Sequence, residues 1–277
     1  MASGAERIRR GGELSGIERA EIYIRSGGFS LHRHDTYAIG LTLSGIQTFH
    51  YRGSLRHCLP GQCHVLHPDE LHDGRAVNGG EFSYRMIYVA PAALQAALDG
   101  AHLPHVTDPI VVLGPETSEL MFRLWNVHDD LIDVEDDEMV LSILSFLQAL
   151  SGETSIISRR AIPWKALSRV RELLVEQSTI RCTAKQLEEI SGLDRWTLAR
   201  EFRAAYGTSP RSFRTMRQLE KVRDLLLKDA SAADAAAVAG FSDQSHMSRM
   251  FKRTYGFTPM QWLEAVRRDK CRFEMGT

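Results

Sequence analysis

The sequence predicts an α+β protein, with an N-terminal β-barrel or sandwich, trailing helices and a C-terminal all-α domain. Three observations predict this class. Short runs of β-branched and aromatic residues, separated by turn residues, fill the first third of the chain. Apolar residues at three- and four-residue intervals dominate from residue 92 onward, and one short pattern occurs twice in the last third. The length of 277 residues is compatible with one large domain or two ordinary ones.

The composition is typical of a soluble globular protein, with 43% hydrophobic and 25% charged residues. No apolar run approaches the roughly 18–20 residues that span a bilayer. The first 16 residues include basic side chains but no apolar stretch behind them, so we expect neither a secretory signal nor a membrane partner. The four cysteines show no CxxC spacing, which favours free thiols and a cytoplasmic location.

Strand-like segments separated by Gly, Pro, Asn and Asp occupy the chain from about residue 21 to residue 89. They are 20–25, 37–45, 47–53, 63–68 and 82–90. Their close spacing predicts a small sandwich or barrel. We therefore expect residues 1–20 to form an N-terminal arm and residues 21–112 to form the β-domain.

Helical spacing of apolar residues marks the stretch 115–150, with an acidic interruption at 135–138. We assign residues 113–150 to a helical segment. The next residues, 151–162, are polar and end just before Pro163, so we assign them to a linker. Everything after Pro163 has a helical pattern.

Charge is distributed unevenly between the two halves. From Pro163 to the end there are 21 basic and 14 acidic residues, a net charge of +7. The preceding 162 residues hold 13 basic and 21 acidic residues, a net charge of −8. The total of −1 thus hides a bipolar molecule, in which only the C-terminal part suits a polyanionic partner such as nucleic acid.

An internal repeat is the strongest signal in the sequence. Phe202-Arg-Ala-Ala-Tyr-Gly-Thr-Ser-Pro210 matches Phe251-Lys-Arg-Thr-Tyr-Gly-Phe-Thr-Pro259 at an offset of 49, and 183–192 matches 231–240 at an offset of 48. Each copy predicts a Ser/Thr N-cap, a short helix, a turn glycine, a second helix and a Gly-x-Ser/Thr-Pro stop. That order is typical of a helix-turn-helix. We place the two units at 183–203 and 231–254, joined by a helix at 210–228, within a domain of residues 163–277.

The second helix of each unit has an apolar inner face and a polar outer face. Leu198 and Phe202 in the first unit, and Met247 and Phe251 in the second, are expected to pack inward. The candidates for base contacts in a major groove are Arg195, Trp196, Ala199, Arg200, Gln244, Ser245, His246 and Arg249. The candidates for phosphate contacts are Thr183, Arg203, Lys252 and Arg253. The alternative is that these are ordinary solvated helix faces, with Trp196 a packing residue at the rim.

The joining helix sets the distance between the two units. If it separates them by about one turn of DNA, roughly 34 Å, both enter successive grooves on one face of the duplex. The partner that this geometry implies is double-stranded DNA.

Residues 165–270 closely resemble the two-unit DNA-binding domain of AraC/XylS-type transcription regulators. The most specific stretch runs from Gly240 through Phe-Ser-Asp-Gln-Ser-His-Met-Ser-Arg-Met-Phe to Lys252, followed by Tyr255-Gly-Phe-Thr-Pro259. In that family the base-facing positions correspond to Trp196, Ala199, Arg200, Gln244, Ser245 and Arg249. The chain departs from the family at Glu188, where a small alanine is common, and in the alanine-rich helix 232–239.

The N-terminal half resembles the cupin-like β-barrel sensor domain of the same family. The residues that carry this resemblance are His32-Arg-His34, Tyr37–Gly45, Pro60-Gly61 and His67-Pro-Asp-Glu-Leu-His72. The resemblance implies a barrel that binds a small-molecule effector. It also implies that helices such as 115–150 mediate formation of a homodimer.

Seven of the eleven histidines fall between residues 32 and 72. His32, His34 and His72 would offer three nitrogens that suit zinc or iron. Metal-binding cupins usually add a Glu shortly after His-x-His, and none follows here. We therefore expect an effector pocket rather than a metal or cofactor site, suited to a polar or anionic molecule. The predicted lining is His32, His34, Tyr37, His67, His72 and Arg85.

Three functions are compatible with parts of the sequence. A ligand-responsive transcription regulator explains the repeat, the charge split and the barrel together. A metal-dependent cupin enzyme with an appended helical domain leaves the repeat unexplained, and a protein-binding adaptor does not need outward arginines on matched helices. No nucleophile–base pair or phosphate-binding glycine loop is present. We predict a regulator and not an enzyme, an activator in keeping with the family's commoner habit, with RNA polymerase as a further partner.

Overall fold

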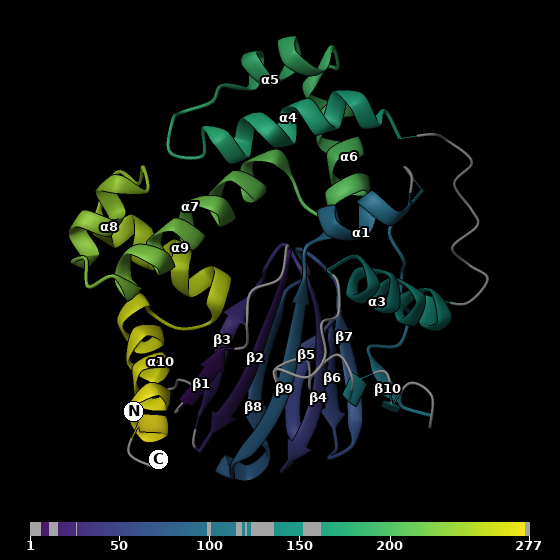
Figure 1. The fold of residues 1–277 in the computed structure, drawn as a ribbon, viewed down its shortest axis with the longest axis vertical. Helices are drawn as coiled ribbons and strands as arrows, with labels where there is room; N and C mark the ends of the chain where they lie inside the picture. The colour runs from purple at the N-terminus through teal and green to yellow at the C-terminus, as the bar shows by residue number, and fades with distance from the viewer. Residues whose placement is uncertain are drawn as a thin grey trace.

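The computed structural model describes residues 7–10, 16–25, 27–98, 101–114, 118–119, 121–122, 136–151 and 162–274. Figure 1 shows an antiparallel β-domain with a helical domain packed along its side and end. No helix in the described part of the chain is both long enough and apolar enough to cross a membrane. The class predicted from the sequence, an α+β protein with a β-domain first, is confirmed.

Two antiparallel sheets form the β-domain within the described residues. One has the strand order β1-β2-β9-β4-β7-β10 and the other β3-β8-β5-β6. The strands are β1 (Arg7–Arg10), β2 (Ile17–Ile24), β3 (Gly28–His32), β4 (Tyr37–Ser44), β5 (Gln47–Tyr51), β6 (Ser54–Cys58), β7 (Gln62–Leu66), β8 (His72–Ala76), β9 (Phe82–Val89) and β10 (Ile110–Val112). A short 3-10 helix, Val77–Gly79, joins β8 to β9 through the loop.

The sheet begins earlier than expected. The sequence predicts an arm at residues 1–20, outside the β-domain. In the structure, β1 within this range pairs with β2, from Arg7↔Tyr23 to Arg10↔Ala20. The sequence of β1, Arg-Ile-Arg-Arg, gives no strand pattern because Ile8 is its only apolar residue. Ile8 is nonetheless buried, since it packs against a C-terminal helix that sequence order places far away.

Alternation along β9 separates two buried clusters. Phe82, Tyr84 and Met86 point to one face, where they join a cluster that includes residues of the second sheet. Ile87 and Val89 point to the other face, where the helix α3 (Asp136–Ser151) covers them. This helix buries an apolar stripe that includes Met139, Ile143 and Phe146. Much of the stripe expected to mediate dimerisation is therefore occupied by the core of its own domain.

The segment expected to be helical, 113–150, is only partly described. The helix α1 (Pro91–Leu98) and the strand β10, which pairs with β7, both precede this segment. The helix α3 occupies the C-terminal end of the segment. Residues 115–117, 120 and 123–135 lie outside the described residues, as do residues 152–161 of the expected linker.

The helical domain contains both predicted units in the described chain. Its helices are α4 (Trp164–Glu176), α5 (Ala184–Ser191), α6 (Arg195–Tyr206), α7 (Pro210–Leu227), α8 (Ala232–Val238), α9 (Gln244–Tyr255) and α10 (Pro259–Glu274). Thr183 caps α5 and Ser231 caps α8 at equivalent places in the repeat. The turn glycines, Gly192 and Gly240, have φ values of 70° and 78°, where a side chain would be strained.

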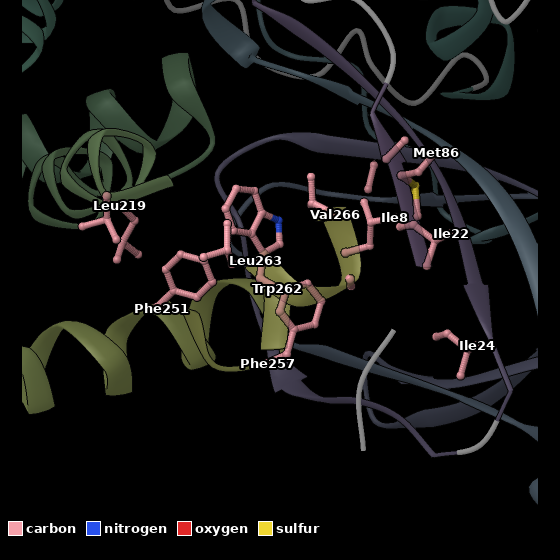
Figure 2. Packing of buried hydrophobic residues seen from close by; sticks show 14 of the residues in the cluster. Ile8, Ile22, Ile24, Met86, Leu219, Phe251, Phe257, Trp262, Leu263 and Val266 are labelled. Carbon is pink, nitrogen blue, oxygen red and sulfur yellow. The ribbon is translucent and has the colours of Figure 1, made fainter. Parts of the chain in front are cut away.

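The two domains share a hydrophobic core. Trp262, Leu263 and Val266 of α10 belong to the same buried cluster as Ile8 and Met86 of the β-domain. Figure 2 shows Val266 of α10 beside Ile8, with Ile22 and Met86 of the sheet on the other side of Ile8. In this arrangement the helical domain and the β-domain are packed together through a common core.

Candidate functional site

The second helix of each unit presents the predicted outer face to solvent. On α6, Leu198 and Phe202 are buried while the side chain of Trp196 is 75% exposed. On α9, Met247 and Phe251 are buried. Asp194 and Asp243 cap the two helices by accepting hydrogen bonds from backbone N–H groups. The exposed candidates for DNA contact are Arg195, Trp196, Arg200, Arg203, Gln244, Ser245, Arg249, Lys252 and Arg253.

Other candidates are partly engaged within the protein. Ala199 and His246 are half-buried, and His246 lies against the ring of Phe241. Thr183 forms a capping box with Gln186, in which its side chain accepts from the Gln186 N–H. Their contacts with DNA stay predictions.

Among the described residues, three ion pairs join the basic domain to the acidic one. Arg203 of α6 lies 3.0 Å from Asp69. Arg217 of α7 lies 2.8 Å from Asp35. Arg223 of α7 binds both carboxylate oxygens of Glu18, at 3.0 Å and 2.5 Å. Part of the positive charge that indicated a polyanionic partner therefore neutralises carboxylates of the β-domain. Arg203, a predicted phosphate contact, is among the residues engaged in this way.

Backbone hydrogen bonds also cross between the domains. The Ser30 N–H of β3 donates to the Gly256 carbonyl at 3.1 Å, and the Arg33 N–H donates to the Arg253 carbonyl at 3.0 Å. A Cβ on Gly256 would lie 2.9 Å from the Cβ of Phe29. The end of α9 thus rests directly on β3, and glycine is required there by both its positive φ and the close approach.

A cavity of about 110 Å³ lies where the domains meet. One wall comes from the β-domain and the other from α7, α9 and the start of α10. Its apolar lining includes Ile22, Met86, Met216, Phe257 and Trp262. Its charged lining includes the Glu18–Arg223 pair and Glu220. Burial raises the pKa of Glu220 to about 7, with Arg217 acting in the opposite direction.

Three of the predicted effector residues line this cavity, namely His32, His34 and His72. Their ring nitrogens lie within 4.8 Å of one another, and all three side chains are buried. Burial lowers the pKa of each to about 3, so the three imidazoles are neutral at physiological pH.

The other three predicted effector residues do not line this cavity. Tyr37 and Arg85 lie on the opposite face of the first sheet, because they alternate with Ala38 and Met86. The Tyr37 hydroxyl donates to the Pro104 carbonyl at 2.6 Å, and Arg85 pairs with Glu21. Along β9, the side chains of Tyr84, Met86 and Tyr88 point toward the cavity. Because side chains alternate along a strand, Arg85 points to the opposite face, and this alternation is the sequence signal that excludes Arg85 from the cavity lining.

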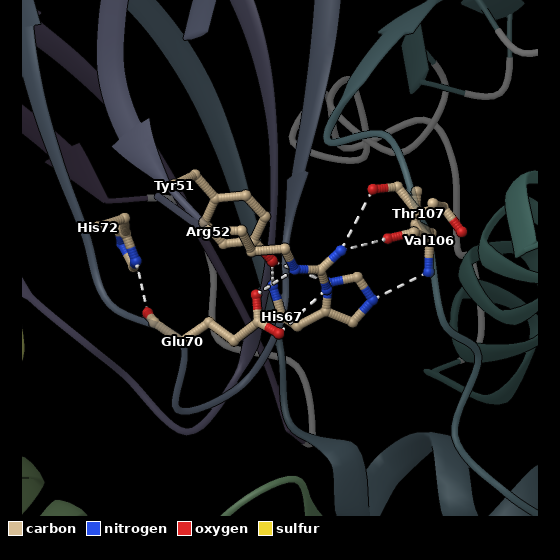
Figure 3. Close-up of polar contacts among 7 residues, drawn as sticks. All are labelled: Tyr51, Arg52, His67, Glu70, His72, Val106 and Thr107. Atoms are coloured by element: carbon tan, nitrogen blue, oxygen red, sulfur yellow. Dashed lines mark hydrogen bonds and ion pairs between the residues drawn. The ribbon is translucent and has the colours of Figure 1, made fainter. Parts of the chain in front are cut away.

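His67 instead ties β7 to the chain at 104–107, as Figure 3 shows. Its Nε2 accepts from the Val106 N–H at 2.9 Å, so the proton is on Nδ1, which donates to the Tyr51 hydroxyl at 3.0 Å. Arg52 lies beside this ring and is itself fixed by Glu70 and by the carbonyls of 106 and 107. This is a structural network rather than a ligand pocket.

The neutral state of His67 predicts an acid-sensitive fold. Burial, with repulsion from Arg52, lowers the pKa of His67 to about 3, against about 6.5 in an unfolded chain. Between these values the unfolded chain takes up a proton that the folded chain does not. The free energy of unfolding should therefore fall as the pH decreases below about 6.5.

His67→Gln should reduce the pH dependence of the free energy of unfolding, measured with urea between about pH 7 and pH 5. The matched control is His57→Gln, on the exposed strand β6, which should leave the slope unchanged. Equal slopes in wild type and His67→Gln would contradict the assignment.

Sequence reasoning missed the helical wall of the cavity. Glu220 and Arg223 stand three residues apart on α7, and Tyr255 and Trp262 flank the turn after α9. Charged residues spaced along the buried side of a helix were an available signal. Nothing local in the sequence indicated that the β-domain would cover them.

Comparison with known proteins agrees with this architecture. The sequence models of two families match, an AraC-like ligand binding domain at residues 15–147 and a helix-turn-helix domain at residues 187–265. The HTH-type transcriptional regulator YbfI of Bacillus subtilis is 26% identical over 223 residues, which cover 79% of this chain and 81% of that protein. RhaS of Yersinia pestis, an HTH-type transcriptional activator, is 21% identical over 226 residues, covering 81% and 69%.

The fold is also similar to solved structures. ToxT from Vibrio cholerae, in a structure with a bound unsaturated fatty acid, aligns with a TM-score of 0.66 at 13% identity. The alignment covers 92% of this chain and 98% of ToxT. The two matched models agree with the relatives, which are named as HTH-type transcriptional regulators. This chain belongs to the AraC family of transcription regulators, with an N-terminal ligand-binding domain and a C-terminal helix-turn-helix domain.

Proposed function

We propose that this regulator responds to a small anionic effector that binds in the cavity between its two domains. The observation that carries the proposal is the composition of the cavity wall, which combines β-domain residues such as Tyr84 with Arg223 and Trp262 of the helical domain. An occupant therefore contacts both domains when they are docked and only one when they separate. A ligand with such different contacts shifts the equilibrium between the two arrangements.

On the DNA side, we propose that α6 and α9 enter successive major grooves. Arg200 and Arg249 are exposed at corresponding places in the two units and are of the type that suits guanine. In this structure the Nε and Nη2 groups of Arg200 donate to Glu201, a pair that binding to a base would replace. Gln244 would suit adenine. Lys252 and Arg253 lie in the last turn of α9, where they would contact phosphates.

The cavity favours a small carboxylate as the effector. A cavity of about 150 Å³ accommodates benzene, so the 110 Å³ found here suits a molecule of no more than about six heavy atoms while the domains stay docked. Arg223 supplies a fixed positive charge at the wall, now paired with Glu18. A carboxylate would compete with Glu18 for this guanidinium. The fatty acid bound to ToxT supports a carboxylate ligand in this fold, although a long chain would need the domains to separate.

We further propose that the protein acts as a homodimeric activator in the cytoplasm and contacts RNA polymerase. Leu141 of α3 remains 53% exposed on the helix that otherwise packs inward, and an exposed leucine there is available to a second subunit. The similarity of this chain to RhaS of Yersinia pestis, an HTH-type transcriptional activator, supports the direction of control.

The test of the proposed function is selection of bound sequences from a random duplex library by the full-length protein. An enriched site of two short blocks about one helical turn apart is expected. Calorimetry with acetate, succinate and longer fatty acids then identifies the effector class. A steep salt dependence without any enriched sequence would contradict the proposal, because it would show only nonspecific charge attraction.

Glycine at the end of α6 provides a separate test of the docked arrangement. Gly207 has a φ of 71°, and a Cβ there would lie 2.5 Å from the Cβ of Pro68 in the β-domain. Gly192 has a similar φ of 70°, but no atom lies within 4 Å of a Cβ placed on it. Both substitutions to alanine carry about 1 kcal/mol of backbone strain, and only Gly207→Ala adds a collision between domains.

We therefore expect Gly207→Ala to enlarge the radius of gyration in small-angle scattering, whereas Gly192→Ala leaves it unchanged. The two variants should lose similar amounts of helix-turn-helix stability. An unchanged radius in both variants would mean that the contact between Gly207 and Pro68 does not hold the domains together.

A further inference from the structure

We propose that His32, His34 and His72 bind a divalent first-row transition-metal ion in the wall of the cavity. The three are the residues of the described chain whose candidate ligand atoms cluster in this way, within 4.8 Å of one another. All three side chains are buried, at 8%, 8% and 4% exposure. The inference stands apart from the proposed effector and does not depend on it.

The hydrogen bonds of the three rings leave the same nitrogen free in each. The Nδ1 atom of His32 lies 2.8 Å from the Ser30 carbonyl, that of His34 lies 2.9 Å from the Thr36 carbonyl, and that of His72 lies 2.9 Å from the Glu70 carbonyl. A carbonyl can only accept, so each Nδ1 carries the proton and each Nε2 has a lone pair. Figure 3 shows the bond from His72 to Glu70.

This is the arrangement in which proteins prepare imidazole for a metal. A ligating histidine usually donates its other ring N–H to a carbonyl or carboxylate, which fixes the tautomer and the direction of the ring. Here all three rings are oriented by backbone atoms, and no side chain needs to move to provide the partner. Among the described residues, none gives a hydrogen bond to any of the three Nε2 atoms, although their side chains are buried.

Strand pairing and a backbone hydrogen bond of the β-domain hold the three histidines in position. His32 ends β3 and His72 begins β8, and the two are direct partners in the antiparallel register of these strands. His34 follows two residues after His32, and the Asp69 N–H donates to the His34 carbonyl at 2.7 Å. The loop that carries His34 is thereby tied to the loop that leads into His72.

The donor set selects a class of metal. Three neutral imidazoles without thiolate suit Zn²⁺, Co²⁺, Ni²⁺ or Fe²⁺ rather than Mg²⁺ or Ca²⁺, which prefer oxygen. A tetrahedral ion with bonds of about 2.1 Å needs nitrogens about 3.4 Å apart, so small rotations of the rings would close the site. The remaining coordination position would face the cavity, where water or an anion can bind.

The absence of a glutamate shortly after His-x-His argued against a metal at the level of sequence. His72, on a neighbouring strand, supplies the third nitrogen, and all three histidines line the cavity. A water molecule or an anion in the cavity would then take the place of that glutamate as the fourth ligand. Open sites of three histidines with a solvent ligand are well suited to exchangeable metals.

The site also touches the helical domain. A Cβ on Gly256 would lie 3.2 Å from the Nδ1 of His32, and the ring of Phe29, which contacts Phe257, lies 5.9 Å from the ring of His32. A metal ion there would add two positive charges beside the turn that follows α9. Binding of a metal ion to the three histidines would therefore change the electrostatics of the contact between the domains.

The test is titration of the full-length protein, stripped with a chelator, with Co²⁺. We expect one Co²⁺ per chain, with visible d–d absorption of a tetrahedral or five-coordinate site, and displacement of Co²⁺ by Zn²⁺. His34→Gln and His72→Gln should weaken binding by at least about 100-fold. The matched controls, His50→Gln and His57→Gln, change exposed histidines of the same domain and should bind as the wild type does.

Circular dichroism of each metal-free variant shows whether it is folded, so that loss of binding is not mistaken for loss of structure. The proposal is overturned if the wild type shows no d–d absorption with excess Co²⁺, or if folded His34→Gln and His72→Gln bind it unchanged. It is also overturned if the control variants lose the signal equally. Selection of operator DNA is measured separately, so failure of the proposed function would leave this result intact.

Discussion

Arg249→Ala is expected to weaken binding to the selected operator by about 1–3 kcal/mol, which is roughly 5- to 150-fold in Kd. The reason is that Arg249 lies exposed on α9, on the face opposite Met247 and Phe251, where an arginine can bind two acceptors of one guanine. Binding to unrelated duplex should change little. Fluorescence anisotropy with operator and scrambled duplexes measures both affinities.

Lys252→Ala provides the control for Arg249→Ala. Lys252 is exposed one turn along the same helix and is assigned to a phosphate, so its loss should weaken both duplexes alike and reduce the salt slope by about one. Arg200→Ala in the first unit should resemble Arg249→Ala, and the two effects should add because they lie in separate units. An equal loss on both duplexes would show that Arg249 contacts only the backbone of DNA.

Glu18→Gln is expected to shift the equilibrium from docked toward separated domains by about 3 kcal/mol, or roughly 150-fold. Arg223 is buried and bonded to both oxygens of Glu18, and removal of one charge leaves the other unpaired in the contact between domains. The figure is at the lower end of values for buried pairs, because 28% of the Glu18 side chain remains exposed.

Hydrogen exchange measures this opening at two amides. The N–H groups of Ser30 and Arg33 donate across the contact to carbonyls of the helical domain, so both should exchange faster in Glu18→Gln. The control is Glu21→Gln on the same strand, whose partner Arg85 belongs to the same domain. Unchanged exchange at Ser30 and Arg33 in Glu18→Gln would show that the ion pair does not hold the domains together.

Local patterns were sufficient to predict the helix-turn-helix units. The buried spacing of Leu198 and Phe202, the caps at Thr183 and Ser231, and the turn glycine Gly192 all depend on neighbours within a few residues. Such signals survive in a single sequence because they are determined by the helix itself. The same holds for His32 and His34, whose alternate spacing on an extended chain put both imidazoles on one side.

Contacts between distant segments could not be predicted in the same way. Ile8 is buried by α10, which lies more than 250 residues later in the chain, and Arg223 pairs with Glu18 across 205 residues. The sequence predicts Tyr37, His67 and Arg85 in the cavity lining because their side-chain types suit an anion. In the structure, each of the three has a partner outside the cavity. Residue type suggested a ligand, and the pairing of the strands decided which residues meet.

The helices α6 and α9 are each held at a second point besides α7. The glycine that ends each helix lies against the β-domain, Gly207 on Pro68 and Gly256 on Phe29. One base pair inserted between two blocks of an operator turns the second block by about 35° around the axis of DNA. Docking of both helices on the β-domain would oppose the rotation of one unit relative to the other that such an insertion requires. On the proposed mechanism, the state of the cavity would then change which spacer lengths the protein accepts.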